Sequence, residues 1–159
     1  MLFRSRIKSG LKPLFNSHMW DGSAVSMPEN MAIAKEMLAM SKAAKTILEI
    51  EIGVVGGEED GVEAKHDAKL YSTPEDALLT LETLGTDPDN RYMVAATFGN
   101  VHGVYKPGNV VLQPKILETL QDAVSAKLGL AKGSKPMEDR KSTRLNSSHT
   151  DISRMPSSA

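Results

Sequence analysis

The sequence predicts an α/β fold made of consecutive strand–helix units with parallel strands. Three short runs of apolar and β-branched residues alternate along the chain with three longer segments of helical periodicity. The short runs are nearly continuous in apolar residues, which is typical of parallel strands that helices cover. A barrel and a doubly wound sheet both satisfy this pattern, so it leaves the architecture open.

The first unit is expected to begin with a strand at residues 13–19, a mostly apolar run that ends at the turn-forming residues 21–23. A helix should follow, because Ser26 and Glu29 have the spacing of a capping box and Pro28 lies in the first turn. Apolar residues at helical spacing predict its buried stripe, which comprises Ile33, Met37, Met40 and Ala44.

The second unit begins with residues 46–52, an apolar and β-branched run that ends at Gly53 and predicts a strand. A long loop rich in glycine and acidic residues should then extend to Thr73. Thr73 and Asp76 have the spacing of a capping box, which predicts a helix that ends at Gly85. The inward-facing residues of this helix are expected to be Leu78 and Leu81.

The third unit begins with a strand at residues 92–98. After a loop with several glycines, Pro114 should start the last helix, which should end at Gly129. The apolar face of this helix comprises Leu117, Leu120, Val124 and Leu128.

Composition argues against several classes of function. The 159-residue chain is 40% hydrophobic and 25% charged, with a net charge of -1 at pH 7, which is typical of a soluble globular protein. Because no broad basic field exists, nucleic acid is not an expected partner. No apolar run approaches the roughly 20 residues of a membrane span, so no membrane association is expected. The absence of cysteine excludes disulfides, thiolate zinc ligands and a cysteine nucleophile, and it fits a cytoplasmic location.

Both ends of the chain differ from its middle. Residues 138–159 are polar without any apolar period, and they resemble the in-frame translation of a common short-read sequencing adapter. Residues 1–5 resemble the opposite adapter, so we expect the biological segment to be residues 6–137. A natural disordered tail is the alternative at the C-terminal end. The basic residues 1–12 also have some likeness to a transit peptide, but they are few and lack the apolar region of a secretory signal.

Polar clusters follow each expected strand, at the edge where parallel α/β proteins carry active sites. They are residues 17–21, residues 49–51 with 56–61, and residues 98–108. The glycine-rich part of the second cluster superficially resembles a calcium loop, but it lacks the alternate acidic ligands and the terminal glutamate of an EF-hand. Lys106, among glycines, is either a point charge for a phosphate or a solvated side chain.

Glu49 and Glu51 are two residues apart on an expected strand, so both side chains should point to one face of the sheet. Carboxylates inside a parallel sheet are costly unless they are paired with a basic residue or bound to a metal. The residues alone leave both explanations open. His102, after the third strand, is likewise either a metal ligand or a satisfied core or loop histidine.

Three segments together resemble a known family. They are Ser17-His18-Met19, the run LEIEIGVVGGEEDG that starts at Leu48, and the run ATFGNVHGVYKPGN that starts at Ala96. In length and order they are similar to class II fructose-bisphosphate aldolases, and the likeness extends from Lys12 to Leu130. The resemblance implies a TIM (β/α)8 barrel, of which this chain would hold the fourth to sixth βα units with an incomplete parallel sheet.

The resemblance also implies an activity, the reversible aldol cleavage of fructose 1,6-bisphosphate to dihydroxyacetone phosphate and glyceraldehyde 3-phosphate, in a cytoplasmic homodimer. In the family, a zinc ion held by three histidines polarises the ketone oxygen and stabilises the enediolate. His102 matches one of those histidines, and Asp21 and Glu51 match ligands of a second divalent metal.

Further site residues follow from the same resemblance. Glu59 matches a catalytic glutamate on a mobile loop, which moves a proton as a general acid and base. Gly103 matches a backbone contact to the triose phosphate, and the carbonyls of Val101 and Gly103 match a monovalent-cation site. Two alternatives remain, namely a class II aldolase that acts on tagatose bisphosphate and a non-catalytic metal-binding module.

The chain departs from the family pattern at two places. It lacks the upstream Thr-Asp-His segment, which carries a catalytic acid and the first zinc histidine, and the downstream His-Gly-Gly-Ser-Gly segment with the third. One histidine of three does not make a closed zinc site. We therefore expect this chain alone to be inactive and, because the edges of its sheet would be open, molten or prone to aggregate.

Overall fold

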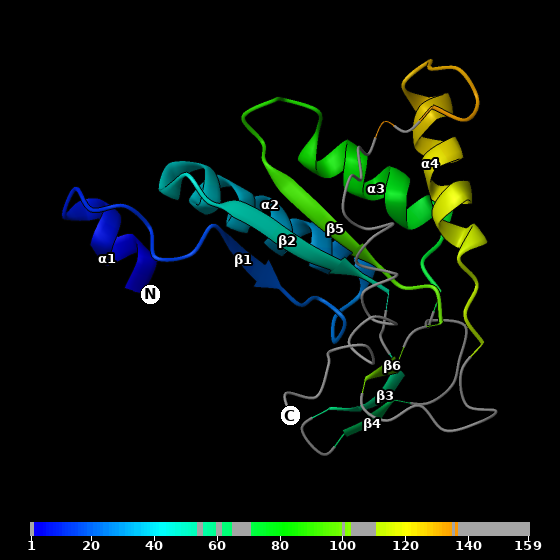
Figure 1. Cartoon of the computed structure of the whole chain (residues 1–159), viewed down its shortest axis with the longest axis horizontal. Coiled ribbons are helices and arrows are strands. Elements are labelled where there is room, and N and C mark those ends of the chain that lie inside the picture. Colours follow the sequence, from blue (N-terminus) through cyan, green and yellow to red (C-terminus); the bar gives the residue numbers. More distant parts are fainter. Residues whose placement is uncertain are drawn as a thin grey trace, which may run out of the picture.

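The computed structural model describes residues 2–53, 56–59, 62–64, 71–99, 101–102, 111–134 and 136. Figure 1 shows a central parallel sheet with helices packed along it and a smaller sheet beyond one of its ends. In chain order the elements are α1 (Leu2–Lys8), β1 (Ser17–Trp20), α2 (Met27–Ala44), β2 (Ile47–Ile52), β3 (Gly56–Glu59), β4 (Val62–Ala64), α3 (Pro74–Leu84), β5 (Tyr92–Ala96), β6 (Val101–His102) and α4 (Lys115–Lys127).

The central sheet has the order β1-β2-β5, and both pairings are parallel. His18 lies opposite Leu48 in the first pairing, and Ile50 lies opposite Val94 in the second. Each of these strands leads to a helix, so the chain contains three consecutive strand–helix units, ending in α2, α3 and α4. The predicted α/β class with parallel strands is confirmed.

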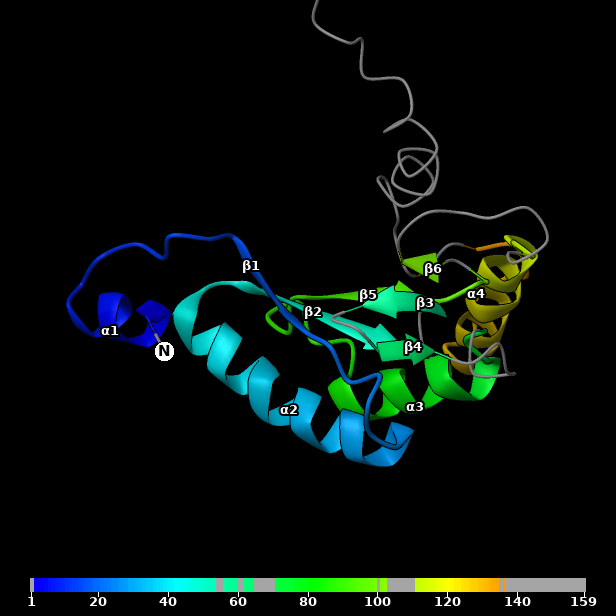
Figure 2. The same ribbon diagram turned by 90° about the horizontal axis from the view of Figure 1, so that it is seen from below.

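Helices α2 and α3 cover one face of the central sheet (Figure 2). Alternation along β2 turns Leu48, Ile50 and Ile52 toward the helices, and each is at most 2% exposed. Burial of an aliphatic side chain of this size contributes about 1.5–3 kcal/mol. These residues form the main hydrophobic cluster together with Met31, Ala34, Leu38 and Leu84.

The buried face of α2 is offset from the predicted stripe. Ala44 is buried as expected, whereas Ile33, Met37 and Met40 are half-buried. The buried apolar residues of this helix are Met31, Ala34, Leu38 and Ala44. Apolar residues occupy two adjacent rows of the helix, so helical spacing alone does not determine which row faces the sheet. Ser26 is the N-cap residue, but its side chain makes no capping hydrogen bond, and the predicted capping box is wrong.

Helix α3 begins with the predicted capping box. Thr73 Oγ1 accepts the N–H of Asp76 at 3.2 Å, and Asp76 Oδ2 accepts the N–H of Thr73 at 2.9 Å. The helix ends at Gly85, as expected. Leu78 and Leu81 are only half-buried, because contacts with both α2 and α4 decide which row of α3 is covered. The fully buried residues of α3 are Ala77, Thr80 and Leu84.

Helix α4 packs on α3 through a second, smaller hydrophobic cluster. Leu120 and Val124 are buried in this cluster, and Leu117 packs at its margin, as predicted. Leu128 is 40% exposed, because it follows the last residue of the helix and lies off the predicted face.

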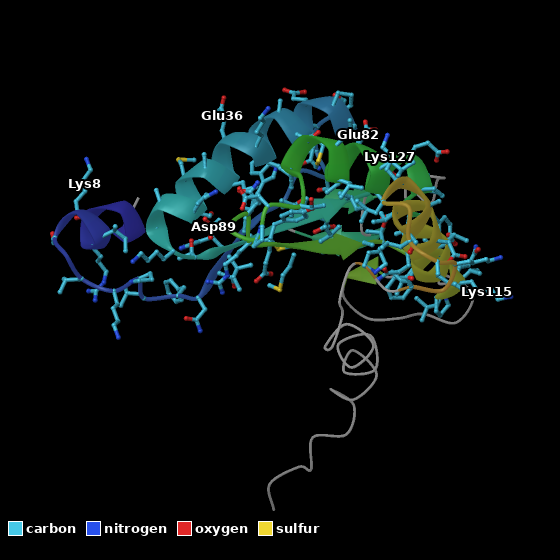
Figure 3. All side chains as sticks on the ribbon, turned by 90° about the horizontal axis from the view of Figure 1, so that it is seen from above. Lys8, Glu36, Glu82, Asp89, Lys115 and Lys127 are labelled. Atoms are coloured by element: carbon cyan, nitrogen blue, oxygen red, sulfur yellow. The ribbon has the colours of Figure 1, made fainter. Side chains whose placement is uncertain are left out.

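Ion pairs on the surface join neighbouring helices and turns. Lys127 Nζ of α4 donates to Glu82 Oε1 of α3 at 2.6 Å (Figure 3). Lys42 of α2 lies 3.5 Å from Asp87, and the N–H of Asp89 together with this lysine lowers the pKa of Asp87. Exposed pairs of this kind contribute little to stability, because water and salt screen them. None of the helices that the structure describes is both long and apolar enough to cross a membrane.

Three local predictions differ from the structure. The strands β1 and β5 are shorter than expected, since β1 begins at Ser17 and β5 ends at Ala96. The predicted loop after β2 contains a hairpin, in which β3 pairs antiparallel with β4. Its glycine and acidic residues have low strand propensity, so the sequence pattern indicates a loop. No helix is expected at residues 2–8, where α1 lies.

The other face of the central sheet carries no helix among the residues that the structure describes (Figure 2). Glu49 and Glu51 both lie on this face, opposite to the buried Leu48, Ile50 and Ile52. Met19 and Met93 lie opposite Glu49 on the neighbouring strands, and they are 53% and 47% exposed. The prediction that the two glutamates share one face is confirmed.

Asn30 joins the carboxyl ends of β1 and β2 to the first turns of α2. Its Oδ1 accepts the indole N–H of Trp20 at 2.8 Å, and its Nδ2 donates to the carbonyl of Glu51 at 2.8 Å. A Cβ at position 22 would lie 2.1 Å from Asn30 Cγ, so Gly22 allows this close approach. Asn30 is 2% exposed, and its amide therefore replaces water for two polar groups at the strand ends.

Substitution Asn30→Ala should loosen the carboxyl ends of β1 and β2. It leaves the Trp20 indole N–H and the Glu51 carbonyl without this partner, at a cost of about 1–3 kcal/mol for each buried group. Since Trp20 is the only tryptophan, its emission should shift to longer wavelength and native-state proteolysis should accelerate. Asn16→Ala is the matched control, because Asn16 is exposed and its carbonyl still accepts the N–H of Ile47. Equal effects of the two substitutions would contradict the assigned role.

Two glycines with positive φ allow a comparison of backbone strain with steric conflict. Gly53 has φ +94°, and a Cβ there would lie 2.2 Å from Thr97 Oγ1, whereas Gly85 has φ +71° with nothing within 4 Å. Gly85→Ala should cost about 1–3 kcal/mol of backbone strain, because φ 71° with ψ -174° is a conformation that essentially only glycine adopts. Gly53→Ala should cost about 1–3 kcal/mol more, because Thr97 must move. Native-state proteolysis rates measure the difference, and similar rates for both variants would disprove it.

Candidate functional site

The carboxyl ends of β1, β2 and β5 lie at one edge of the central sheet, because the three strands are parallel. The smaller sheet, of order β4-β3-β6, lies beyond this edge (Figure 1). Most of the site residues predicted from the sequence lie on these strand ends or on the smaller sheet. The topology therefore brings segments distant in the sequence to one side of the molecule.

Asp21 and Glu51 come from the ends of neighbouring strands. Trp20, the last residue of β1, lies opposite Ile50, so Asp21 follows directly after β1 and Glu51 is the next residue of β2. Asp21 is exposed, and its Oδ1 accepts the N–H of Ser23 at 2.9 Å. Glu51 is 7% exposed, and Asn30 holds its carbonyl. The backbone thus places two carboxylates side by side, one accessible and one buried.

Glu59 and His102 lie on paired strands of the smaller sheet. The parallel pairing of β3 with β6 places Gly56 opposite Val101 and Gly57 opposite His102. Glu59 follows on β3 and pairs with Val62 of β4. Gly103, together with Lys106, lies outside the described residues.

Ser72 and Thr97 form a buried hydrogen-bonded cluster, the Ser72–Thr97 cluster, at the carboxyl ends of β2 and β5. Ser72 Oγ donates to the carbonyl of Ile52 at 2.6 Å and accepts the N–H of Thr97 at 2.8 Å. The Ser72 N–H donates to the carbonyl of Thr97 at 2.8 Å, and the two hydroxyl oxygens are 3.2 Å apart. Both residues are at most 3% exposed. The Ser72–Thr97 cluster holds both ends of the segment that carries Glu59, at Ile52 and Ser72, against the end of β5.

Residues 111–113 are fixed to the same region. The N–H of Gln113 donates to the carbonyl of Phe98 at 2.8 Å, and the Tyr71 hydroxyl donates to the carbonyl of Val111 at 3.1 Å. Tyr71 also forms an antiparallel bridge with Phe98. A Cβ at position 99 would lie 2.2 Å from the carbonyl oxygen of Val111, so Gly99 is required for this approach.

The described residues do not assemble a complete metal site. No group of three or more His, Asp or Glu side chains able to hold a metal ion occurs within the described part of the chain. His18 lies on β1 opposite Leu48, and its ring packs edge-on against Phe15. A zinc site with three histidines therefore does not fit the described part of this chain.

Sequence reasoning missed the residues that hold the site together. Asn30, Ser72 and Thr97 are each at most 3% exposed and bonded to strand-end carbonyls or amides. A weak signal exists for Thr97, because it lies in the run that starts at Ala96 and resembles a known family. Nothing in a single sequence indicates that the side chains of Ser72 and Thr97 meet.

Comparison with known proteins identifies the family. Residues 4–151 match the profile described as fructose-bisphosphate aldolase class-II. The fructose-bisphosphate aldolase of Corynebacterium glutamicum is 58% identical over 135 residues, which are 85% of this chain and 39% of that protein. The aldolase of Mycobacterium tuberculosis H37Rv is 59% identical over 133 residues, with coverage of 84% and 39%. This chain thus spans about two fifths of the length of these relatives.

A solved structure has the same fold over the matching part. The fructose-bisphosphate aldolase of Campylobacter jejuni superposes with a TM-score of 0.62 and 43% sequence identity, over 84% of this chain and 36% of the other. The three parallel strands and their helices therefore form part of a TIM barrel, and the predicted alternative of a doubly wound sheet is rejected. By its sequence profile, its relatives and its fold, this chain belongs to the class II fructose-bisphosphate aldolase family.

Proposed function

We propose that this chain supplies the central strand–helix units of an aldolase that reversibly cleaves fructose 1,6-bisphosphate to dihydroxyacetone phosphate and glyceraldehyde 3-phosphate. The pairing of β3 with β6 carries this proposal, because it holds the strand of Glu59 beside the strand of His102 at the carboxyl edge of the sheet. Barrel enzymes build their active sites at this edge. The family membership and the names of the relatives support the reaction.

Glu59 is the proposed general acid and base. A carboxylate held on the short strand β3 near the sheet edge is suited to moving a proton at the carbon next to the substrate carbonyl. Gly103 is proposed to bind the triose phosphate through its backbone. Because the peptide N–H is a fixed donor, a glycine there would let the phosphate approach closely.

Metal ligation is proposed for the complete barrel and not for this chain alone. His102 would contribute one of the three zinc histidines, and Asp21 and Glu51 would contribute to a second divalent metal position. Zinc acts as a Lewis acid on a carbonyl oxygen. The carbonyls of Val101 and Gly103 are the proposed ligands of a monovalent cation. The complete enzyme is proposed to be a cytoplasmic homodimer.

A hybrid barrel tests the reaction. Residues 12–130 of this chain would replace the matching segment of the Corynebacterium glutamicum aldolase, which is 58% identical. We expect the hybrid to cleave fructose 1,6-bisphosphate, and Glu59→Gln should lower kcat by about 10²- to 10⁴-fold with the fold retained. Glu36→Gln, on the exposed surface of α2, is the matched control and should leave kcat unchanged (Figure 3).

The same hybrid distinguishes the alternatives. Faster turnover of tagatose 1,6-bisphosphate would favour the aldolase with that epimer preference. A folded hybrid with bound zinc and no turnover of either sugar would refute the proposed function. His102→Ala should reduce zinc content measured by metal analysis, independently of the rate.

The unaltered 159-residue chain should lack aldolase turnover. The reason is that one proposed zinc histidine of three does not close a catalytic metal site. Assay with added zinc, combined with a thermal melt, measures this directly. A cooperative melt together with turnover would show that the chain is an enzyme by itself, and zinc uptake by a soluble inactive monomer would favour a metal-binding module.

A further inference from the structure

We propose that Ser72 and Thr97 are positioning residues that couple the positions of two loops. The first loop, between β2 and α3, carries Glu59, and the second, between β5 and α4, carries His102. The ends of both loops are bonded to one another at the carboxyl edge of the central sheet. The register between β3 and β6 therefore depends on residues that lie away from both Glu59 and His102.

The Ser72 hydroxyl uses its full hydrogen-bonding capacity in the Ser72–Thr97 cluster. It donates its single hydrogen to the Ile52 carbonyl at 2.6 Å and accepts the N–H of Thr97 at 2.8 Å. With that hydrogen committed, the Thr97 hydroxyl has two acceptors within reach, Ser72 Oγ at 3.2 Å and the Ile52 carbonyl at 3.5 Å. Loss of Ser72 Oγ thus removes partners from three groups at once. In a buried site, such a loss is costly because water does not replace it.

The pairing between β3 and β6 is too short to persist without this support. It consists of two residue pairs, Gly56 with Val101 and Gly57 with His102, and two of the four residues are glycine. Glycine weakens a strand because it loses more backbone entropy on ordering and has no side chain to pack. Fixing the ends of both loops shortens the free chain that must be ordered, which lowers the entropic cost of the pairing.

Tight packing makes the Ser72–Thr97 cluster rigid. A Cβ at position 53 would lie 2.2 Å from Thr97 Oγ1 and 3.1 Å from Ser72 Oγ. Phe98 and Gly99 continue directly into the second loop, where Gln113 and Val111 hold the far end. The start and end of each loop are thereby connected through contacts of a few ångströms.

The coupling of the loops stands on the geometry alone, whereas its role in catalysis rests on the proposed function. In the reaction, anchored loop ends would limit the positions that the strand of Glu59 takes relative to the strand of His102. Positioning of this kind affects the chemical step more than substrate binding.

Amide hydrogen exchange of the hybrid barrel tests the coupling, because the chain alone is expected to be molten. Ser72→Ala should raise the exchange rates of residues 56–59 and 101–102 about tenfold relative to α2, because a lost buried hydrogen bond opens the pairing locally. Thr97→Val keeps the side-chain shape and the Ser72–Ile52 bond, so we expect a smaller rise of about threefold.

Ser125→Ala is the matched control, because Ser125 is also a buried serine whose hydroxyl donates to a backbone carbonyl, that of Ser134 at 3.2 Å. It should leave exchange in β3 and β6 unchanged. The coupling is overturned if β3 and β6 lack protection in the unaltered hybrid, if only one of the two responds to Ser72→Ala, or if Ser125→Ala has the same local effect.

The hybrid barrel tests the catalytic consequence separately. Ser72→Ala should lower kcat about tenfold with KM nearly unchanged, and Ser125→Ala should alter neither. A local rise in exchange without a fall in kcat would refute the positioning role but leave the coupling intact. An inactive unaltered hybrid would instead count against the proposed function, which the exchange data do not depend on.

Discussion

Parallel pairing of β1, β2 and β5 is the constraint on which the site depends. Because the strands run in one direction, their last carbonyl and amide groups all reach the same edge, where no further strand residue satisfies them. Buried polar groups at such an edge must find partners. In this molecule Asn30 bonds to the Glu51 carbonyl, and Ser72 bonds to the Ile52 carbonyl and the Thr97 amide. The same bonds that satisfy the backbone also position the loops.

The residues that hold the strand ends differ from the residues proposed to act in the reaction. The supporting side chains are neutral amides and hydroxyls, and they are almost fully buried behind the strand ends. The proposed acid, Glu59, lies on a short strand beyond the edge, and the proposed ligand Asp21 is exposed. A neutral support suits a buried position, because burial of an uncompensated charge is far more costly than burial of a hydrogen-bonded hydroxyl.

The sequence predicts the order and type of the main elements well, and the reasons are local. Pro74 with the Thr73–Asp76 capping box, and apolar runs of strand length, are signals that neighbouring residues provide. The face of α2 that is buried is not predicted correctly. The helix has two apolar rows, and only its packing on the sheet determines which row is covered. The β3–β4 hairpin is not predicted, because many of its residues are glycine or acidic and have low strand propensity.

For the site, spacing places Glu49 and Glu51 on one face, and motif likeness singles out Glu59 and His102. The bonds of Asn30 to Trp20 and of Ser72 to Thr97 were beyond prediction. These contacts join residues 10 and 25 positions apart, and such long-range contacts are products of the packed fold rather than of the local pattern.

Alternation along β2 also protects the strand against misfolding. A slip of one residue would turn Glu49 and Glu51 under α2 and expose Leu48, Ile50 and Ile52 to solvent. Glu49, which is only half-buried, would then lose its remaining hydration against an aliphatic helix face, and burial of a carboxylate without a compensating partner is costly. The alternation of acidic and aliphatic residues along β2 therefore disfavours a one-residue slip of this strand during folding.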